Sequence, residues 1–412
     1  MKKISIPARR WYENKEKIIF FPPRWQVDNL TSPGLEKRAL RAGQIKNRID
    51  HPVEGAPLED LARGKKQAVI VFDDMTRPTP VKDTAPYVLK ALHRAGMKRG
   101  QIRFIWALGS HGAYDMIAAR KKLGDGIVEK YPVYNHDAFQ NTAHAGKTPG
   151  GIDVWFNREF MSCDLKIGIG CITPHVHVGF GGGAKIIFPG VAGIESIKSF
   201  HEHYNVDPSH HGLGNFENNT MRFECDAAGD IAGLDFKVDC LVNRRGEVAG
   251  IYAGAFRSTH KQGAAEAKGA YGITTTGGYD IVVANTYAKA NEAGIAMLLV
   301  RQLIRGDKKG IDIIISDAPE GQVPHYVFGH WGKDYGGWHY HFMRKGFISS
   351  FMKKLILFNP LPTPSCLKWI GHEDDITAVK TWPEVLGILR GEFPSAARVG
   401  VIPDATMQYL KN

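Results

Sequence analysis

Two short turns, each directly after an apolar run, concentrate side chains that can bind anions and move protons. Residues 73–78 follow the apolar run 68–72 and include Asp74, Thr76 and Arg77. A guanidinium can grip a carboxylate or phosphate through two hydrogen bonds. His111 follows the run 102–108, and an imidazole there suits a general acid or base near neutral pH. An Asp–Arg pair that ties the loop and a purely structural histidine remain the alternatives.

A third turn, residues 173–190, is the richest in the chain. It contains His175, the consecutive glycines Gly181, Gly182 and Gly183, and then Lys185. Backbone N–H groups of such glycines can approach a phosphate or a flat ring closely. The turn is not a Walker A loop, because alanine precedes the lysine and isoleucine follows it. Lys185 is a candidate nucleophile, covalent anchor or phosphate-binding charge.

These turns belong to a repeating pattern of apolar, β-branched runs that alternate with helix-like stretches. The runs are 68–72, 102–108, 165–169, 281–284 and 311–315. Strands that are apolar throughout and alternate with helices are typical of parallel sheets covered on both faces. The predicted fold class is α/β with mainly parallel sheets. Ligand sites in such folds lie beyond the carboxyl ends of the strands, where the three turns occur.

We expect two α/β domains. The predicted domains are residues 1–267 and 268–394, because glycine and threonine clusters punctuate the chain near 265–278. A helix with proline in its first turn is expected at 382–389, and a last strand at 398–402.

Composition narrows the class of protein. The 412 residues have a formal net charge of +11, and 15 basic against 8 acidic residues fall in the first 66. The basic residues alternate with acids and turns, so we expect no nucleic-acid partner. The sequence has no long apolar span and no signal-like start, which predicts a cytoplasmic protein without a membrane partner. The five cysteines contain no C-x-x-C pair and are expected to be buried thiols.

The motifs in these three turns resemble those of a known family, the nickel-pincer-nucleotide enzymes related to lactate racemase. The matching features are Asp-x-Thr-Arg-Pro at 74–78, Gly-x-His at 109–111, Pro-His-x-x-x-Gly-Phe-x-Gly-Gly-Ala-Lys from Pro174 to Lys185, and a histidine sixteen residues after that lysine. Together they cover residues 70–205, about a third of the chain.

The resemblance implies a role for each matching residue. Lys185 would bond covalently to a pyridinium-3,5-bisthiocarboxylic acid mononucleotide that holds nickel, and His201 would be a nickel ligand. His111 and His175 would be acid and base on opposite faces of the substrate. Arg77 would orient the substrate carboxylate. The remaining expected contacts are Lys289 for substrate and Asp74, Thr76, Gly181, Gly182 and Gly183 for cofactor.

The implied activity is a racemase or 2-epimerase of a 2-hydroxy acid, in which a hydride leaves C2 and returns to the other face. Proteins that synthesise the cofactor would be transient partners. The resemblance also implies that the active site lies in the cleft between the two domains and that residues 395–412 return to the first domain. After the family tyrosine, Tyr287, the sequence departs from lactate racemase, which favours a larger 2-hydroxy acid such as a sugar acid or an aryl hydroxy acid. Aromatic residues at 331 and 338–341 are candidates for lining its pocket.

One alternative class stays open on the residues alone. The glycine turn could hold a phosphate or another anion. The histidine pairs at 175/177 and 210/211 permit a zinc hydrolase, although no Cys-x-x-Cys or His-Glu-x-x-His accompanies them.

Overall fold

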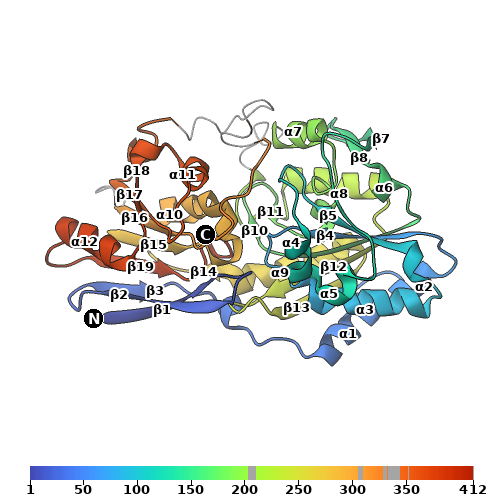
Figure 1. Ribbon diagram of the computed structural model, residues 1–412, viewed down its shortest axis with the longest axis horizontal. Helices are drawn as coiled ribbons and strands as arrows, with labels where there is room; N and C mark the ends of the chain where they lie inside the picture. Colours follow the sequence, from blue (N-terminus) through green and yellow to red (C-terminus); the bar gives the residue numbers. More distant parts are fainter. Residues whose placement is uncertain (203–209, 305–309, 328–331, 333–343, 351, 412) are drawn as a thin grey trace. The chain divides into compact units, whose positions relative to one another are not determined.

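The computed structural model describes residues 1–202, 210–304, 310–327, 332, 344–350 and 352–411. The chain forms two compact units (Figure 1). Unit 1 comprises Met1–Leu35 and Tyr271–Asn412, and unit 2 comprises Glu36–Ala270. Each unit is built around one six-stranded sheet. The predicted α/β class with mainly parallel sheets is confirmed.

The unit 2 sheet has the order β13-β12-β9-β4-β5-β6. All neighbours pair in parallel except β12 and β13. Its strands are β4 (Ala68–Asp73), β5 (Ile102–Ala107), β6 (Val133–Asn135), β9 (Leu165–Cys171), β12 (Phe236–Val242) and β13 (Val248–Gly254). Every residue of β4 is buried, as expected for a central strand covered on both faces.

Helices and short hairpins complete unit 2. The helices are α1 (Ala42–Asp50), α2 (Leu58–Ala62), α3 (Val81–Arg94), α4 (Met116–Leu123), α5 (Asp125–Val128), α6 (Arg158–Met161), α7 (Ile194–Glu202), α8 (Thr220–Ala232) and α9 (Phe256–Tyr271). The hairpins pair β7 (Thr142–Lys147) with β8 (Asp153–Asn157), and β10 (Pro174–His175) with β11 (Gly179–Phe180).

The unit 1 sheet has the order β18-β17-β16-β15-β19-β3 and is parallel throughout. Its strands are β3 (Gln26–Asn29), β15 (Ile281–Asn285), β16 (Ile311–Ile315), β17 (Lys354–Phe358), β18 (Ile376–Val379) and β19 (Arg398–Ile402). The other elements are β1 (Lys2–Ala8), β2 (Lys15–Phe21), β14 (Gly272–Ile273), the 3₁₀ segment η6 (Tyr287–Ala296), α10 (Met297–Leu303), α11 (Pro364–Ile370), α12 (Trp382–Glu392) and β20 (Tyr409–Leu410).

The two ends of the chain correct one prediction. Residues 395–412 do not return to the unit that contains the glycine turn, because β19 pairs in parallel with β15 and with β3. Val399 and Val401 of β19 are fully buried in the core of unit 1. The first 35 residues also belong to this unit rather than to the domain predicted for them.

The N-terminal hairpin accounts for part of the basic excess at the start of the chain. Lys17 on β2 lies 2.9 Å from Asp317, and Arg9 in the turn after β1 lies 3.3 Å from the same carboxylate. Asp317 follows β16 closely and is buried. Arg9 and Lys17 therefore form ion pairs within unit 1.

All five cysteines are free and buried, as predicted. Over the part of the chain that the structure describes, none of the helices has the length and apolar character needed to cross a bilayer.

Candidate active site

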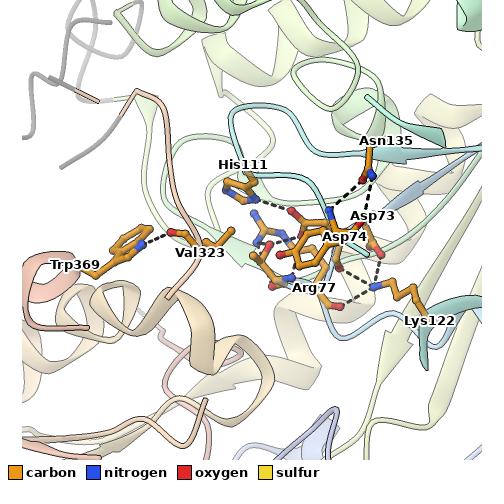
Figure 2. A network of polar contacts seen from close by, with 10 residues as sticks. Asp73, Asp74, Arg77, His111, Lys122, Asn135, Val323 and Trp369 are labelled. Atoms are coloured by element: carbon orange, nitrogen blue, oxygen red, sulfur yellow. Dashed lines mark hydrogen bonds and ion pairs between the residues drawn. The ribbon is translucent and has the colours of Figure 1, made fainter. Parts of the chain in front are cut away.

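The predicted site residues of unit 2 lie at the carboxyl ends of β4, β5 and β9. The chain runs from β4 outward to β5 and β6 on one side, whereas β9 and β12 lie on the other. The strand order thus reverses between β4 and β9, which is the topological switch point where open α/β sheets bind ligands. Asp74 follows β4, His111 follows β5, and His175 follows β9. Figure 2 shows the contacts around the first two turns.

Asp74 and His111 form a close pair. Oδ2 of Asp74 lies 2.5 Å from Nδ1 of His111, and the side chains are 3% and 10% exposed. Oδ1 of Asp74 accepts a hydrogen bond of 2.8 Å from the backbone N–H of Thr76 and another from the Thr76 hydroxyl. Burial alone would raise the pKa of Asp74, but the charges of His111 and Arg77, with the hydrogen bonds, lower it. The carboxylate therefore stays ionised and orients the imidazole.

Arg77 lies on the same loop, half-buried. Its Nη1 donates to the Thr76 hydroxyl at 2.7 Å and to the Thr76 carbonyl at 3.1 Å. These contacts fix the direction of the guanidinium. A half-buried guanidinium held in this way suits the binding of a carboxylate.

Lys122 holds this loop in place and was not predicted from the sequence. It is fully buried on α4 and lies 2.8 Å from the carboxylate of Asp73. Its ammonium also donates to the carbonyls of Asp74 at 2.7 Å and Arg77 at 2.8 Å (Figure 2). The ion pair and the two hydrogen bonds together fix the backbone on which Asp74 and Arg77 stand.

The glycine turn is held by protein groups. The N–H of Gly183 donates to Asp239 Oδ2 at 2.7 Å, and the carbonyl of Gly182 accepts from Arg222 at 3.1 Å. Asp239 in turn lies 2.5 Å from Lys237, and both side chains are fully buried in β12. The N–H of Gly183 is therefore not available to an anion, which weighs against the phosphate-binding alternative.

Packing also explains why glycine occupies the second and third positions of the turn. Gly182 has φ +90° and Gly183 has φ +57°, in the left-handed region that side chains disfavour. A Cβ at Gly182 would lie 2.8 Å from Ile172, and one at Gly183 would lie 2.9 Å from His260. Gly181 differs, because its nearest neighbours would be 3.6 Å away. Close packing against protein, rather than against a ligand, requires the last two glycines.

His201 on α7 has the features of a metal ligand. It is 7% exposed, and its Nδ1 lies 2.7 Å from the carbonyl oxygen of Ile197. Burial lowers its pKa to about 4, and the charges of Lys185 and His111 contribute to this shift. The ring is therefore neutral, with its proton on Nδ1 and a lone pair on Nε2, which is the state a metal ligand requires.

Other predicted residues lie near enough to His201 for their charges to affect its ring. The charges of half-buried Lys185, on the 3₁₀ turn Gly183–Ile186, and of His111 both act on His201. A row of imidazoles continues the site: the ring centroids of His175 and His177 are 5.5 Å apart, and those of His177 and His201 are 5.3 Å apart. His177 is buried between the other two and was not predicted as a site residue.

Lys289, the other predicted substrate contact, belongs to unit 1. It is 1% exposed at the start of η6, and its charge acts on the buried carboxyl of Asp404, which follows β19. Both residues follow strands where the order of that sheet reverses, between β15 and β19. The aromatic residues expected to line a pocket, at 331 and 338–341, lie outside the described residues.

No three His, Cys, Asp or Glu side chains within the described ranges gather into a group that could hold a metal ion by themselves. The zinc hydrolase alternative thus has no ligand set there. A metal held largely by a cofactor needs fewer protein ligands, and the neutral ring of His201 fits that requirement.

Comparison with known proteins finds similarity to lactate racemases. Residues 12–212 match the family described as "Lactate racemase N-terminal domain". The lactate racemase of Thermoanaerobacterium thermosaccharolyticum is 29% identical over 268 residues, covering 64% of this chain and 62% of its own length. The lactate racemase of Lactiplantibacillus plantarum is 29% identical over 221 residues, covering 53% of this chain and 52% of its own length. The aligned regions thus span less than two thirds of these relatives.

Solved structures share the fold. The lactate racemase apoprotein from T. thermosaccharolyticum superposes with a TM-score of 0.76 at 21% identity and covers 100% of both chains. A crystal structure of a protein from Thermotoga maritima gives a TM-score of 0.65 at 19% identity and covers 93% of this chain and 100% of the other. The chain therefore shares its fold with the lactate racemase apoprotein, and its residues 12–212 are similar to the N-terminal domain of lactate racemases.

Proposed function

We propose that the protein is an isomerase, a racemase or 2-epimerase of a 2-hydroxy acid, that works with a nickel-pincer nucleotide. The observation that carries the proposal is the buried ring of His201, whose Nδ1 lies 2.7 Å from the Ile197 carbonyl, in the same unit as Lys185 and the Asp74–His111 pair. The family supports the same activity, since both similar curated proteins are lactate racemases.

The residues present fit the cofactor. The ammonium of Lys185 is half-buried and follows a turn braced by Asp239 and Arg222, which suits a fixed covalent anchor. His201 offers Nε2 as a nickel ligand because Ile197 holds its Nδ1 proton. When bound, the cofactor would supply a reversible acceptor for the C2 hydride of the substrate.

The chain's own residues would supply binding and proton transfer. Arg77 would hold the substrate carboxylate, and Lys289 is proposed as a second substrate contact. His111, oriented by Asp74, would accept the hydroxyl proton, and the developing imidazolium would be stabilised by the adjacent carboxylate. His175 would serve the opposite face of the same carbon. Asp74 and Thr76 would then act by orienting His111 and Arg77 more than by touching the cofactor.

Intact mass tests the cofactor. Protein produced together with the cofactor-synthesis proteins should carry an adduct of a few hundred daltons on the peptide that contains Lys185, with about one nickel per chain. Lys185→Ala should lose the adduct, whereas the exposed-lysine control Lys130→Ala should keep it. Unmodified, nickel-free protein under these conditions would contradict the proposal.

A substrate screen tests the reaction. The loaded enzyme should invert C2 of at least one 2-hydroxy acid among lactate, aryl hydroxy acids and sugar acids. Hydride return predicts that the C2 hydrogen is retained during inversion in D₂O. Rapid exchange of that hydrogen with solvent would instead indicate proton abstraction at carbon.

A further inference from the structure

The two proposed acid–base histidines make different hydrogen bonds through the same ring atom. Nδ1 of His111 lies 2.5 Å from Oδ2 of Asp74. An ionised carboxylate can only accept a hydrogen bond, so Nδ1 of His111 carries a proton. When this ring is neutral, its Nε2 has a lone pair and is a proton acceptor.

The ring of His175 has the opposite arrangement. The backbone N–H of His177 donates to Nδ1 of His175 at 3.2 Å. A backbone N–H can only donate, so Nδ1 of His175 carries no proton while this bond is made. The proton of the neutral ring is then on Nε2, which is a hydrogen-bond donor.

We propose that the protein holds these two imidazoles in opposite tautomers, with His111 an acceptor and His175 a donor at Nε2. The groups that set this polarity are the carboxylate of Asp74 and the main-chain N–H of His177. Both act as positioning groups, since each acts on Nδ1, the ring atom away from Nε2.

The consequence for the reaction rests on the proposed function. The hydroxyl group of a 2-hydroxy acid would give its proton to Nε2 of His111, and the cofactor of the proposed function would supply the acceptor for the C2 hydride. The oxygen of the planar keto acid would accept a hydrogen bond from Nε2–H of His175. The O–H bond of the substrate breaks as the N–H bond of His111 forms. The resting enzyme is thus prepared to begin with the substrate whose hydroxyl faces His111.

One substitution should reverse the tautomer of His111 alone. In Asp74→Asn, the two donors of Thr76 keep the amide oxygen at the Oδ1 position. The amide NH₂ then faces Nδ1 of His111 and can only donate to it. The proton of His111 must move to Nε2, while His175 keeps its partner and its tautomer.

Two buried histidines provide internal references. Nδ1 of His201 lies 2.7 Å from the Ile197 carbonyl, so this ring is of the same type as His111. Nε2 of His136 lies 2.8 Å from the Ala192 carbonyl, and its Nδ1 accepts from the Asn157 amide at 3.2 Å, so this ring is of the same type as His175.

The test is a two-bond ¹H–¹⁵N spectrum of the full chain labelled with ¹⁵N-histidine, taken at a pH above which the ring shifts no longer change. His111→Gln and His175→Gln assign the two signals. Nε2 should have a pyridine-type shift in His111 and a pyrrole-type shift in His175. Asp74→Asn should move only the His111 Nε2 signal to the pyrrole type.

The same tautomer for both rings in the unsubstituted protein would overturn the inference, as would an unchanged His111 signal in Asp74→Asn. If that variant does not fold, the spectrum of the unsubstituted protein decides alone. The measurement needs neither cofactor nor turnover. A racemase assay that fails while the two tautomers are found as stated would count against the proposed function only.

Discussion

The ammonium of Lys122 on α4 lies 2.8 Å from the carboxylate of Asp73 at the end of β4. The two charges neutralise each other beneath the loop that carries Asp74 and Arg77. The structure therefore ties Asp74 and Arg77, for which we propose roles at the substrate, to a buried ion pair.

Removing one partner of this pair should destabilise the fold. Lys122→Met leaves the Asp73 carboxylate buried without its cation and leaves the carbonyls of Asp74 and Arg77 without their shared donor. A loss of about 3–5 kcal/mol in the free energy of unfolding is expected. Urea denaturation measures it. The double variant Lys122→Met/Asp73→Asn should recover part of the loss, and equal stability of the single variant and the original protein would contradict the assignment.

The glycine turn allows a matched comparison. Gly183→Ala places a Cβ 2.9 Å from His260 at a residue with φ +57°, so the backbone or the histidine must shift. We expect a decrease of about 1–3 kcal/mol in unfolding free energy, measured by urea denaturation without cofactor. Gly181→Ala meets its first neighbour at 3.6 Å and should change stability little. The opposite ranking of the two variants would refute the packing explanation.

Stability should fall in mild acid partly because of His136. Burial lowers its pKa from 6.5 to about 4. Between these values the unfolded chain binds a proton that the folded chain excludes, so the stability contribution is present above pH 6.5 and is lost as pH decreases. The total is about 3 kcal/mol. His136→Gln, followed by urea denaturation at several pH values, should show a shallower decrease, and an unchanged slope would exclude His136 as a contributor.

The acid–base roles predict a specific kinetic effect. His111→Ala and His175→Ala should each lower kcat about 10²–10⁴-fold, because each removes one proton-transfer group. The Lys185 adduct, checked by intact mass, should remain in both variants. His51→Ala, which changes an exposed histidine, should retain full activity. Full activity in either site variant would remove that histidine from the mechanism.

The turns after the strands could be predicted because the signal is local. Asp74, His111 and His175 stand directly after apolar runs, and parallel strands bring their carboxyl ends to one edge of a sheet. The strands predicted at 68–72, 165–169 and 398–402 correspond to β4, β9 and β19.

The buried ion pairs that support the site could not be predicted from local sequence patterns. Each charged residue is recognisable as buried only when its partner in the folded structure is known. Lys122 stands beside Arg120 and Lys121 in a helix, which is typical of a solvated basic face, yet Lys122 is fully buried. Lys237 and Asp239 alternate with apolar residues in β12, which favours a strand with one exposed face. The strand is buried on both faces because the two charges pair with each other.

The pairing of β3 with β19 also could not be predicted from local patterns. More than 350 residues separate Gln26 from its strand partner Arg398, and no local pattern encodes such a distance.

That separation has a consequence for synthesis on the ribosome. All strands of the unit 2 sheet come from one uninterrupted stretch, so they have been synthesised before β15 is translated. The sheet of unit 1 forms later, because β19 lies between β15 and β3 and is translated after every other strand of that sheet. A nascent chain that stops short of residue 398 has an open edge on β15 and leaves β3 without the strand that it pairs with.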